Sequence, residues 1–272
     1  MRVEDIKARD ARPPRRQIRC GLGKGCKAHA IVCPVAPGPV RIGAAITVEI
    51  GGGIGTFTKL LVNAHLACNP AARLTVFEPE EALCRRLRDE LEQTHSGIIR
   101  TGRLVITGGY FQPSPDQCDT VIMINVLEHI QDDQESVRAA YQSLSPSGTF
   151  VVYSPALQWL YSPHDKAVGH YRRYEMNHLE QIVRKEGFVV VAAKYMDCMG
   201  VLPWYLLNVL GGSTSIDPRL ARLYDTWFVP LTRAVERLWR PWIGKNVLVV
   251  ARKNGRPVTT GPVDTAGSHG IG

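Results

Sequence analysis

The sequence lacks a long hydrophobic run. Its most apolar stretch, VLPWYLLNVLGG at 201–212, contains Pro203 and Asn208 and falls well short of the about 20 apolar residues that a membrane-spanning helix needs. The first apolar stretch, AHAIVCPVAPGPV at 28–40, is broken by prolines and lies too far into the chain for a secretory signal. We therefore expect a cytoplasmic protein that does not cross a membrane.

Paired cysteines are also lacking. The seven cysteines stand singly along the 272 residues, and an odd, scattered set predicts reduced thiols in a cytosolic setting. Cys20, Cys26, His29 and Cys33 are close in sequence, but zinc sites of this kind are usually built on C-x-x-C pairs. No metal site is predicted.

The formal net charge of +8 does not come from the body of the chain. Residues 1–41 hold ten lysines and arginines against three acidic residues, and 252–272 hold three against one. The remaining 42–251 carry 20 basic and 21 acidic side chains, so no basic groove for nucleic acid is predicted. Segment 1–41 and tail 254–272 lack periodicity and are predicted to be irregular or disordered.

Short apolar runs alternate with helical patterns between these ends. Continuous apolar strands separated by helices are typical of a mainly parallel sheet with helices on both faces. We therefore predict one α/β domain over 42–253, with a doubly wound sheet. Seven strands are expected, at 45–50, 74–78, 102–107, 118–125, 148–154, 187–196 and 245–253.

A glycine-rich turn, VEIGGGIG at 48–55, joins the first predicted strand to a helix. Glycines let a ligand approach the backbone closely. The dinucleotide fingerprint G-x-G-x-x-G would need a third glycine where Thr56 stands. Glu49, just before the glycines, would repel a pyrophosphate and suits a ligand with an ammonium or sulfonium group.

Glu78 ends the second predicted strand, 27 residues after Gly51. An acid there lies at the carboxyl edge of the sheet, beside the crevice where doubly wound folds bind ligands, and can accept hydrogen bonds from both ribose hydroxyls. A solvated charge at the strand end is the alternative. Together with Glu49 and the glycine turn, Glu78 indicates a cationic ligand that carries a nucleoside.

At these positions the sequence resembles the class I S-adenosylmethionine-dependent methyltransferases, over about residues 45–253. VEIGGGIG resembles their first motif, VFEPE at 76–80 their ribose-binding strand, and CDTVIMINVLEHIQDD at 118–133 their fourth-strand motif. The resemblance implies a Rossmann-like sheet whose last strand is antiparallel. Segments 160–188 and 244–253 resemble a bacterial branch of methyltransferase type 11/12.

The resemblance implies S-adenosylmethionine as the cofactor. The implied contacts are Glu49 near the amino group, Gly51, Gly52, Gly53 and Gly55 along the methionine and ribose, Glu78 at the ribose hydroxyls, Gly109 and Tyr110 beside adenine, and Asn125, Val126 and Leu127 beneath the sulfonium. GGYFQ at 108–112 lacks the acid that often binds the adenine amino group. Segment 19–43 likewise does not resemble the helix that covers the cofactor in related enzymes.

Methyl transfer from a sulfonium is an in-line displacement, in which the protein positions the acceptor and removes a proton where necessary. His129, at the end of NVLEH, is the first candidate base, followed by His170 and His164. The alternative for His129 is a residue that orients the start of a helix. Glu128 is interpreted as structural.

An acceptor pocket is predicted in YSPHDKAVGHYRRY at 161–174, after the fifth strand. Its two arginines could clamp a carboxylate or phosphate. The alternative is a loop pinned by salt bridges, with tyrosine rings that cover apolar surface. The predicted substrate residues are Tyr161, Asp165, Tyr171, Arg172, Arg173 and Tyr174.

An insertion, 197–244, separates the last two predicted strands and holds every tryptophan except Trp159. Three interpretations stay open: core packing at the sheet edge, a hydrophobic lid over an apolar acceptor, and contact with a membrane surface or a second subunit. The basic ends of the chain would suit an anionic bilayer.

The sequence thus predicts a methyltransferase acting on an O, N or C of a small-molecule, lipid-like or sugar-linked acceptor, with peripheral membrane contact as an option. A nucleic-acid substrate is disfavoured, because NVLEH stands where such enzymes often carry N-P-P-Y. Two alternatives remain: a non-catalytic protein that binds S-adenosylmethionine, and an NAD(P)-dependent oxidoreductase. The oligomeric state is open.

Overall fold

The computed structural model describes residues 46–67, 69–113, 117–215 and 217–254. The predictions for 1–41, for the cysteine–histidine group within it and for the tail after residue 254 lie outside the described residues.

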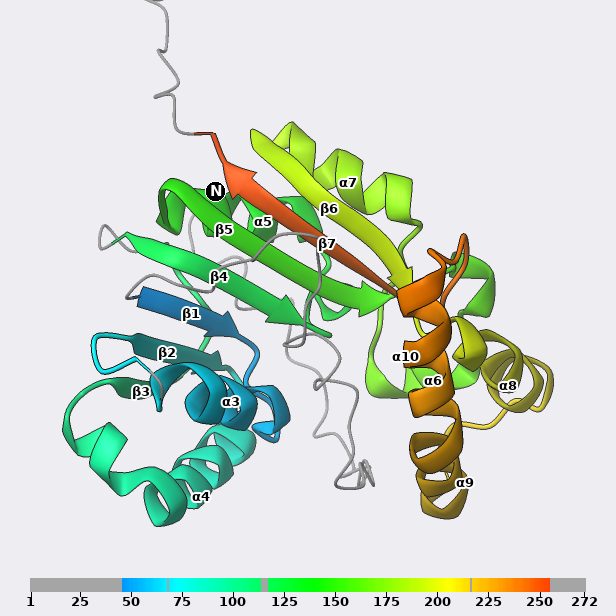
Figure 1. The fold of residues 1–272 in the computed structure, drawn as a ribbon, viewed down its shortest axis with the longest axis horizontal. Coiled ribbons are helices and arrows are strands. Elements are labelled where there is room, and N and C mark those ends of the chain that lie inside the picture. The colour runs from blue at the N-terminus through cyan, green and yellow to red at the C-terminus, as the bar shows by residue number, and fades with distance from the viewer. Residues whose placement is uncertain (1–45, 68, 114–116, 216, 255–272) are drawn as a thin grey trace, which may run out of the picture.

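The strands of the described chain form one sheet, in the order β3-β2-β1-β4-β5-β7-β6 (Figure 1). Neighbours from β3 through to β5 are parallel, whereas β7 is antiparallel to both β5 and β6. The predicted doubly wound, mainly parallel sheet with an antiparallel last strand is confirmed. The strands are β1 (Ile46–Ile50), β2 (Arg73–Glu78), β3 (Leu104–Gly108), β4 (Cys118–Ile124), β5 (Leu144–Pro155), β6 (Phe188–Met196) and β7 (Asn246–Lys253).

Helices follow most of the strands, and the segment between β6 and β7 is largely helical. The helices outside that segment are α3 (Thr56–Leu61) with its π-helical continuation η1 (Val62–Leu66), α4 (Glu81–Arg100), η2 (Leu127–His129), α5 (Asp133–Ser143), η3 (Gln158–Leu160), α6 (Pro163–Val168) and α7 (Met176–Lys185). Those within it are η4 (Cys198–Gly200), α8 (Val201–Trp204), η5 (Tyr205–Leu210), α9 (Pro218–Leu223), η6 (Tyr224–Phe228) and α10 (Val229–Leu238).

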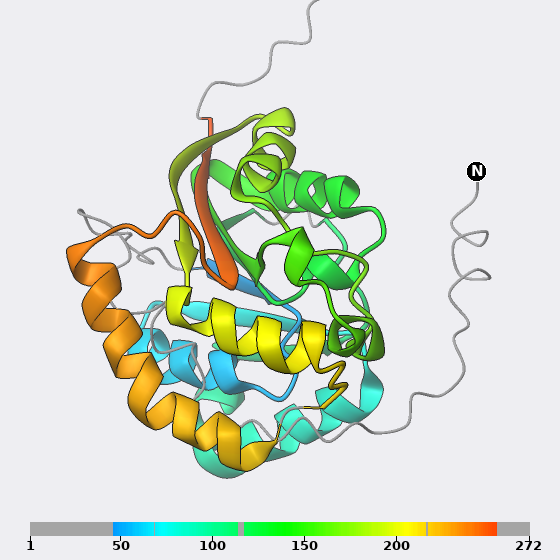
Figure 2. The ribbon, with the colours of Figure 1, turned by 90° about the vertical axis from the view of Figure 1, so that its right-hand side faces the viewer.

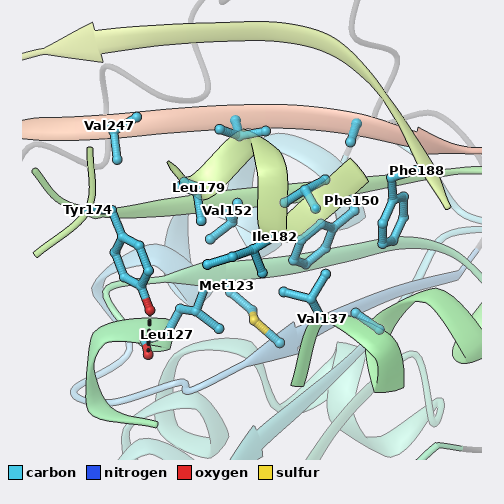
Figure 3. Close-up of a cluster of buried hydrophobic side chains, with 14 of the residues drawn as sticks. Met123, Leu127, Val137, Phe150, Val152, Tyr174, Leu179, Ile182, Phe188 and Val247 are labelled. Carbon is cyan, nitrogen blue, oxygen red and sulfur yellow. Dashed lines mark hydrogen bonds between the residues drawn. The ribbon is translucent and has the colours of Figure 1, made fainter. Parts of the chain in front are cut away.

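Both faces of the sheet are buried, because alternate side chains of each central strand point to opposite sides. Met123 and Phe150 belong to the core beneath α5 and α7 (Figure 3). Their neighbours Ile122 and Val151 belong to the core beneath α3 and α4. This is why the strands are continuous apolar runs in the sequence.

Tyr174 closes the first of these cores at the carboxyl end of β4. Its ring is fully buried, and its hydroxyl donates to the Leu127 carbonyl at 3.2 Å (Figure 3) and to Asp133 Oδ2 at 3.0 Å. The prediction that Tyr174 lines an acceptor pocket is therefore wrong. The tyrosine is a core residue that ties two loops to the sheet.

The chain reverses its direction of winding between β1 and β4, since β2 and β3 lie on one side of β1 and β4 and β5 on the other. Doubly wound folds bind ligands at the carboxyl ends of the strands beside such a point. The glycine turn follows β1, Glu78 ends β2 and Asn125 follows β4. The fold therefore brings these three predicted features to one edge of the sheet.

The insertion lies beyond the same edge. In Figure 1, strands β4, β5 and β6 point towards α6 and towards α8–α10. Figure 2 shows α8–η5 in yellow and α9–η6–α10 in orange as two helical rods set at an angle to each other. In the part of the chain that the structure describes, no helix is long and apolar enough to span a bilayer.

Candidate cofactor and acceptor site

Three glycines of the turn after β1 are confined by the protein itself. A Cβ atom on Gly51 would lie 2.3 Å from Val126 Cγ2, and one on Gly55 would lie 2.3 Å from Leu87 Cδ1. One on Gly52 would lie 2.6 Å from a Val76 methyl group. These glycines let β1, β2 and α4 pack closely, and they bring the loop after β4 against the turn.

Gly53 differs, because a Cβ atom there would have no neighbour within 4 Å. Its N–H donates to Glu78 Oε2 at 2.7 Å, and the Glu80 N–H donates to Glu78 Oε1 at 2.9 Å. A carboxylate has about four lone-pair sites, so each oxygen of Glu78 can accept a further hydrogen bond. Gly53 and Glu78 thus frame an open position beside an oriented acceptor.

Glu49 supplies a second acid at this position. Its side chain is buried, and Oε2 has no hydrogen-bond partner among the described residues. Burial raises the pKa of Glu49 to about 8; the Thr58 hydroxyl opposes this shift and the Glu78 carboxylate adds to it. A buried acid with an unsatisfied oxygen is suited to a cationic ligand, which would favour its ionised form.

Gly109 and Tyr110 follow β3 on the outer side of Glu78. The Gly109 N–H donates to the Glu78 carbonyl at 3.2 Å, and Gly109 borders a shallow pocket with Pro79 and Cys84. The Tyr110 side chain is 75% exposed. Their place beside adenine stays a prediction.

Asn125 connects β4 to η2 in a left-handed conformation, with φ 53°. Its N–H donates to the Tyr153 carbonyl at 2.8 Å. Left-handed residues other than glycine are uncommon and often lie at functional sites. Here the conformation turns the chain sharply, so that Val126 meets Gly51 and Leu127 enters the core.

Glu128 and two histidines form a cluster next to this turn. Glu128 is fully buried, and neither carboxylate oxygen has a hydrogen-bond partner among the described residues. His170 Nε2 lies 3.9 Å from Glu128 Oε1, and the His129 and His170 rings meet edge to face at 4.6 Å. Burial raises the pKa of Glu128 to about 7, against the opposing effect of His170.

Asp165 orients His170 from the other side. Asp165 Oδ1 lies 2.8 Å from His170 Nδ1 and accepts from Arg173 Nε at 3.0 Å, while Oδ2 accepts from the Ser162 hydroxyl at 2.8 Å. Burial alone would raise the pKa of Asp165, but bonds from His170 and Arg173 lower it to about 2. An ionised carboxylate only accepts, so the His170 proton is on Nδ1 and Nε2 faces Glu128.

Comparison with known proteins agrees with this geometry. Residues 48–150 match a family model described as a methyltransferase domain, of type 12. No curated protein matches the chain. With the glycine turn, Glu78 and the sheet order, this match decides the family. The chain carries a class I S-adenosylmethionine-dependent methyltransferase domain.

Solved structures share the fold of this methyltransferase at low sequence identity. A phosphoethanolamine N-methyltransferase 2 from Haemonchus contortus, in complex with S-adenosylmethionine, has a TM-score of 0.57 at 14% identity, over 86% of this chain and 55% of that one. An S-adenosylmethionine-dependent methyltransferase from Mesorhizobium loti has a TM-score of 0.51 at 15% identity, over 78% of this chain and 93% of that one. An O-methyltransferase family 2 protein from Planctomyces limnophilus, in complex with apigenin, has a TM-score of 0.51 at 17% identity, over 82% of this chain and 56% of that one.

S-adenosylmethionine is the cofactor of this methyltransferase, and the crevice fits it. The unsatisfied Glu49 oxygen matches a positive charge, the Gly53 side of the turn leaves room, and Glu78 presents two acceptors. A pyrophosphate, by contrast, would face two carboxylates. This charge pattern supports the sulfonium cofactor over a dinucleotide.

The Glu128–His129–His170 cluster could act on protons or hold a metal ion. Their ligand atoms all lie within 4.8 Å of one another, and the carboxylate behind His170 is a common partner of both metal-binding and catalytic histidines. The sequence analysis predicted no metal and interpreted Glu128 as structural. The missed signal was the adjacent Glu–His pair at the end of β4.

Both arginines of the predicted acceptor clamp are paired within the protein. Arg173 is buried and bonded to Asp165 and to the Ala156 carbonyl, while Arg172 donates to Asp133 Oδ2 at 2.7 Å. Asp165 itself has no exposed surface. These contacts favour the alternative that the sequence left open, a loop pinned by salt bridges.

Two tyrosines of that segment still border the histidine pair. The Tyr161 hydroxyl donates to the His170 carbonyl at 2.8 Å, and the Tyr171 N–H donates to the Glu128 carbonyl at 2.8 Å. The Tyr171 side chain is 38% exposed. Tyr161 and Tyr171 therefore stay as candidate acceptor contacts.

His164 is tied to the insertion instead. Its Nδ1 lies 2.9 Å from the Thr214 carbonyl, and its ring packs against Trp204. Burial lowers the pKa of His164. The centroid of the Trp204 ring lies 4.6 Å from Arg173 Cζ and 4.8 Å from Lys245 Nζ. These contacts attach the insertion to the acceptor side of the site.

Alanine substitutions in the glycine turn should separate packing from ligand binding. We expect Gly55→Ala to lower the free energy of unfolding by about 2 kcal/mol or more, because it adds a left-handed penalty and a clash with Leu87. Gly53→Ala should lower the free energy of unfolding by only about 1 kcal/mol, but it should weaken the binding of S-adenosylmethionine. Urea unfolding and titration calorimetry measure the two effects.

Gly97→Ala is the control for these variants, since Gly97 is exposed in α4 with open space around it. It should be neutral or slightly stabilising. Equal destabilisation by Gly53→Ala and Gly55→Ala, or unchanged cofactor affinity in Gly53→Ala, would contradict the assignment of Gly53.

Glu49 should make stability depend on pH. Its pKa is about 8 in the fold against an ordinary value of 4.5 for glutamate, so between these values the folded state binds more protons and the free energy of unfolding falls as pH rises. Glu49→Gln should reduce this fall and exceed the wild type in stability above pH 8. The raised pKa of Glu128 also makes the free energy of unfolding fall as pH rises, so the Glu49→Gln variant should keep a smaller dependence on pH.

Urea titrations from pH 5 to 9 would follow this dependence, with the exposed Glu81→Gln as control. An unaltered slope in Glu49→Gln would show that Glu49 does not titrate in this range.

Proposed function

We propose that this methyltransferase transfers the methyl group to a hydroxyl oxygen of a small, apolar or sugar-linked acceptor in the cytoplasm. The supporting observation is His170, which Asp165 orients through Nδ1 and which presents Nε2 beside Glu128 next to the cofactor crevice. A hydroxyl must lose its proton on methylation, so an oriented base is useful there. The apigenin in one related structure and the phosphoethanolamine in the name of another are small molecules as well.

S-adenosylmethionine supplies an electrophilic methyl group on a positively charged sulfur. Glu49 would neutralise the amino group of its methionine part, and Glu78 would accept from the ribose hydroxyls. The strained turn at Asn125 would hold the backbone beneath the sulfonium. Most of the rate enhancement then comes from alignment of the acceptor oxygen with the methyl group.

His170 would take the acceptor proton at Nε2. Asp165 fixes the tautomer and stabilises the imidazolium that forms, as a buried carboxylate does behind other catalytic histidines. Glu128, 3.9 Å away, adds a second carboxylate. His129 packs on the edge of His170 and would position it, and Tyr161 and Tyr171 would contact the acceptor. A non-catalytic protein would have no need for this arrangement.

Cofactor binding gives the first test. Titration calorimetry of the full chain should show micromolar binding of S-adenosylmethionine and none of NAD. Glu78→Ala should weaken binding by about tenfold or more, because charged hydrogen bonds to the ribose are lost. Glu81→Ala, an exposed acid paired with Arg85, should bind as the wild type does. Binding of NAD, or full affinity in Glu78→Ala, would overturn the assignment.

Turnover tests the base. With release of S-adenosylhomocysteine as the readout, a panel of hydroxyl-bearing apolar compounds and glycosides should contain an acceptor. His170→Gln should then lower kcat by about 100-fold or more, with cofactor affinity unchanged. The exposed His178→Gln is the control, and a larger loss in His129→Gln than in His170→Gln would reassign the base.

A further inference from the structure

Exposed apolar side chains concentrate on the insertion. Thirteen of the twenty large hydrophobic residues that are exposed in the described chain lie between 202 and 243. Leu238 is 91% exposed and Trp242 is 83% exposed. A concentration of this kind on a water-soluble protein marks an interaction surface.

These side chains form stripes along the helices. Leu202 and Leu206 are four residues apart on α8–η5, and Leu223, Trp227 and Leu231 follow at the same interval on α9–η6–α10. Residues four apart lie on one face of a helix. Each rod therefore carries an exposed apolar stripe.

The other side of the insertion is held to the body by polar contacts. Asp197 pairs with Lys245 at 3.4 Å, the Trp204 indole N–H donates to the Leu160 carbonyl at 3.1 Å, and the Thr214 carbonyl lies 2.9 Å from His164 Nδ1. The exposure of the stripes therefore does not result from a detached segment. The helices are fixed in an orientation that keeps their apolar sides outward.

Exposed arginines accompany the apolar stripe of α9–η6–α10. Arg219, Arg222, Arg237 and Arg240 are exposed, whereas Asp217 is the one exposed acid among the described residues of the insertion. Interfacial helices combine an apolar face with arginine or lysine and with tryptophan at the headgroup level. Such a surface matches the charge of anionic lipids.

We propose that helices α8 to α10 dock this methyltransferase on an anionic lipid bilayer. The apolar stripes would enter the boundary between headgroups and acyl chains, and the arginines would contact lipid phosphates. Trp204 and His164 connect this surface to the acceptor side of the site. As a deepening of the proposed function, docking would present a lipid-held hydroxyl acceptor to His170.

Other occupants fit less well. In a twofold contact between copies, the same patch meets itself, so the exposed arginines would face one another. The N-terminal residues 1–41 carry ten basic against three acidic side chains, so their charge has the same sign as the surface. Lipid phosphates have the opposite sign.

Vesicle sedimentation of the full chain tests the proposal, with phosphatidylcholine vesicles and with mixed vesicles of phosphatidylcholine and phosphatidylglycerol. Binding should be stronger to the mixed vesicles and weaken as salt is added. Trp227→Gln with Leu231→Gln should lower the partition coefficient by about tenfold or more. The matched control is Val189→Gln with Val191→Gln, both exposed on β6.

A second pair tests the charge. Arg219→Gln with Arg222→Gln should weaken binding to the mixed vesicles only, and Arg85→Gln with Arg86→Gln, exposed on α4, should leave it unchanged. Calorimetry with S-adenosylmethionine should give wild-type affinity for all four variants. Calorimetry thus tests the cofactor assignment, and vesicle sedimentation tests docking independently of it.

Three results would overturn the docking proposal. The first is a wild type that does not sediment with either vesicle. The second is equal vesicle binding by the insertion variants and their controls. The third is a dimer, seen by light scattering, that Trp227→Gln with Leu231→Gln converts to a monomer, because the apolar stripes would then be an interface between copies.

Discussion

The buried carboxylate of Asp165 connects the parts of the site that the chain supplies from distant positions. It orients His170, neutralises Arg173 and closes the start of α6 through Ser162. Arg173 then stacks on Trp204, which fastens the insertion. Removal of this one charge would leave a buried arginine without its partner, a cost of several kcal/mol in comparable cases. The orientation of the proposed base and the attachment of the insertion thus depend on the same ion pair.

In the cofactor crevice, packing explains three of the glycines, and charge explains the two acids. Gly51, Gly52 and Gly55 are glycines because neighbouring side chains occupy the space of a Cβ atom, whereas Gly53 leaves its space open. The acids Glu49 and Glu78 then select for positive charge. Because Glu49 is buried with a raised pKa, a cationic ligand would ionise it, so cofactor binding and release of a proton would be linked.

The insertion leaves many apolar side chains of its helices exposed. Val201 and Trp204 pack against the core, but many of its leucines and three of its tryptophans are exposed to water. Exposure of so much apolar surface costs free energy in water and marks a surface that meets an apolar partner. Its attachment beside His164 and Arg173 places that surface next to the proposed base. Recognition of an apolar acceptor and attachment to a bilayer would then share one structural element.

The sequence by itself determined the sheet, the glycine turn and the acid at the end of β2, because apolar periodicity and residue spacing are local properties. It also identified the three histidines. Only the tertiary structure decided their surroundings: Glu128 in η2 and Asp165 in α6 lie to either side of His170, Tyr174 and Arg173 turn inward, and Arg172 pairs with Asp133. Whether a polar side chain in 161–174 faces a ligand or the core depends on partners far away in the chain, such as Asp133 and Trp204, and no local pattern records those contacts.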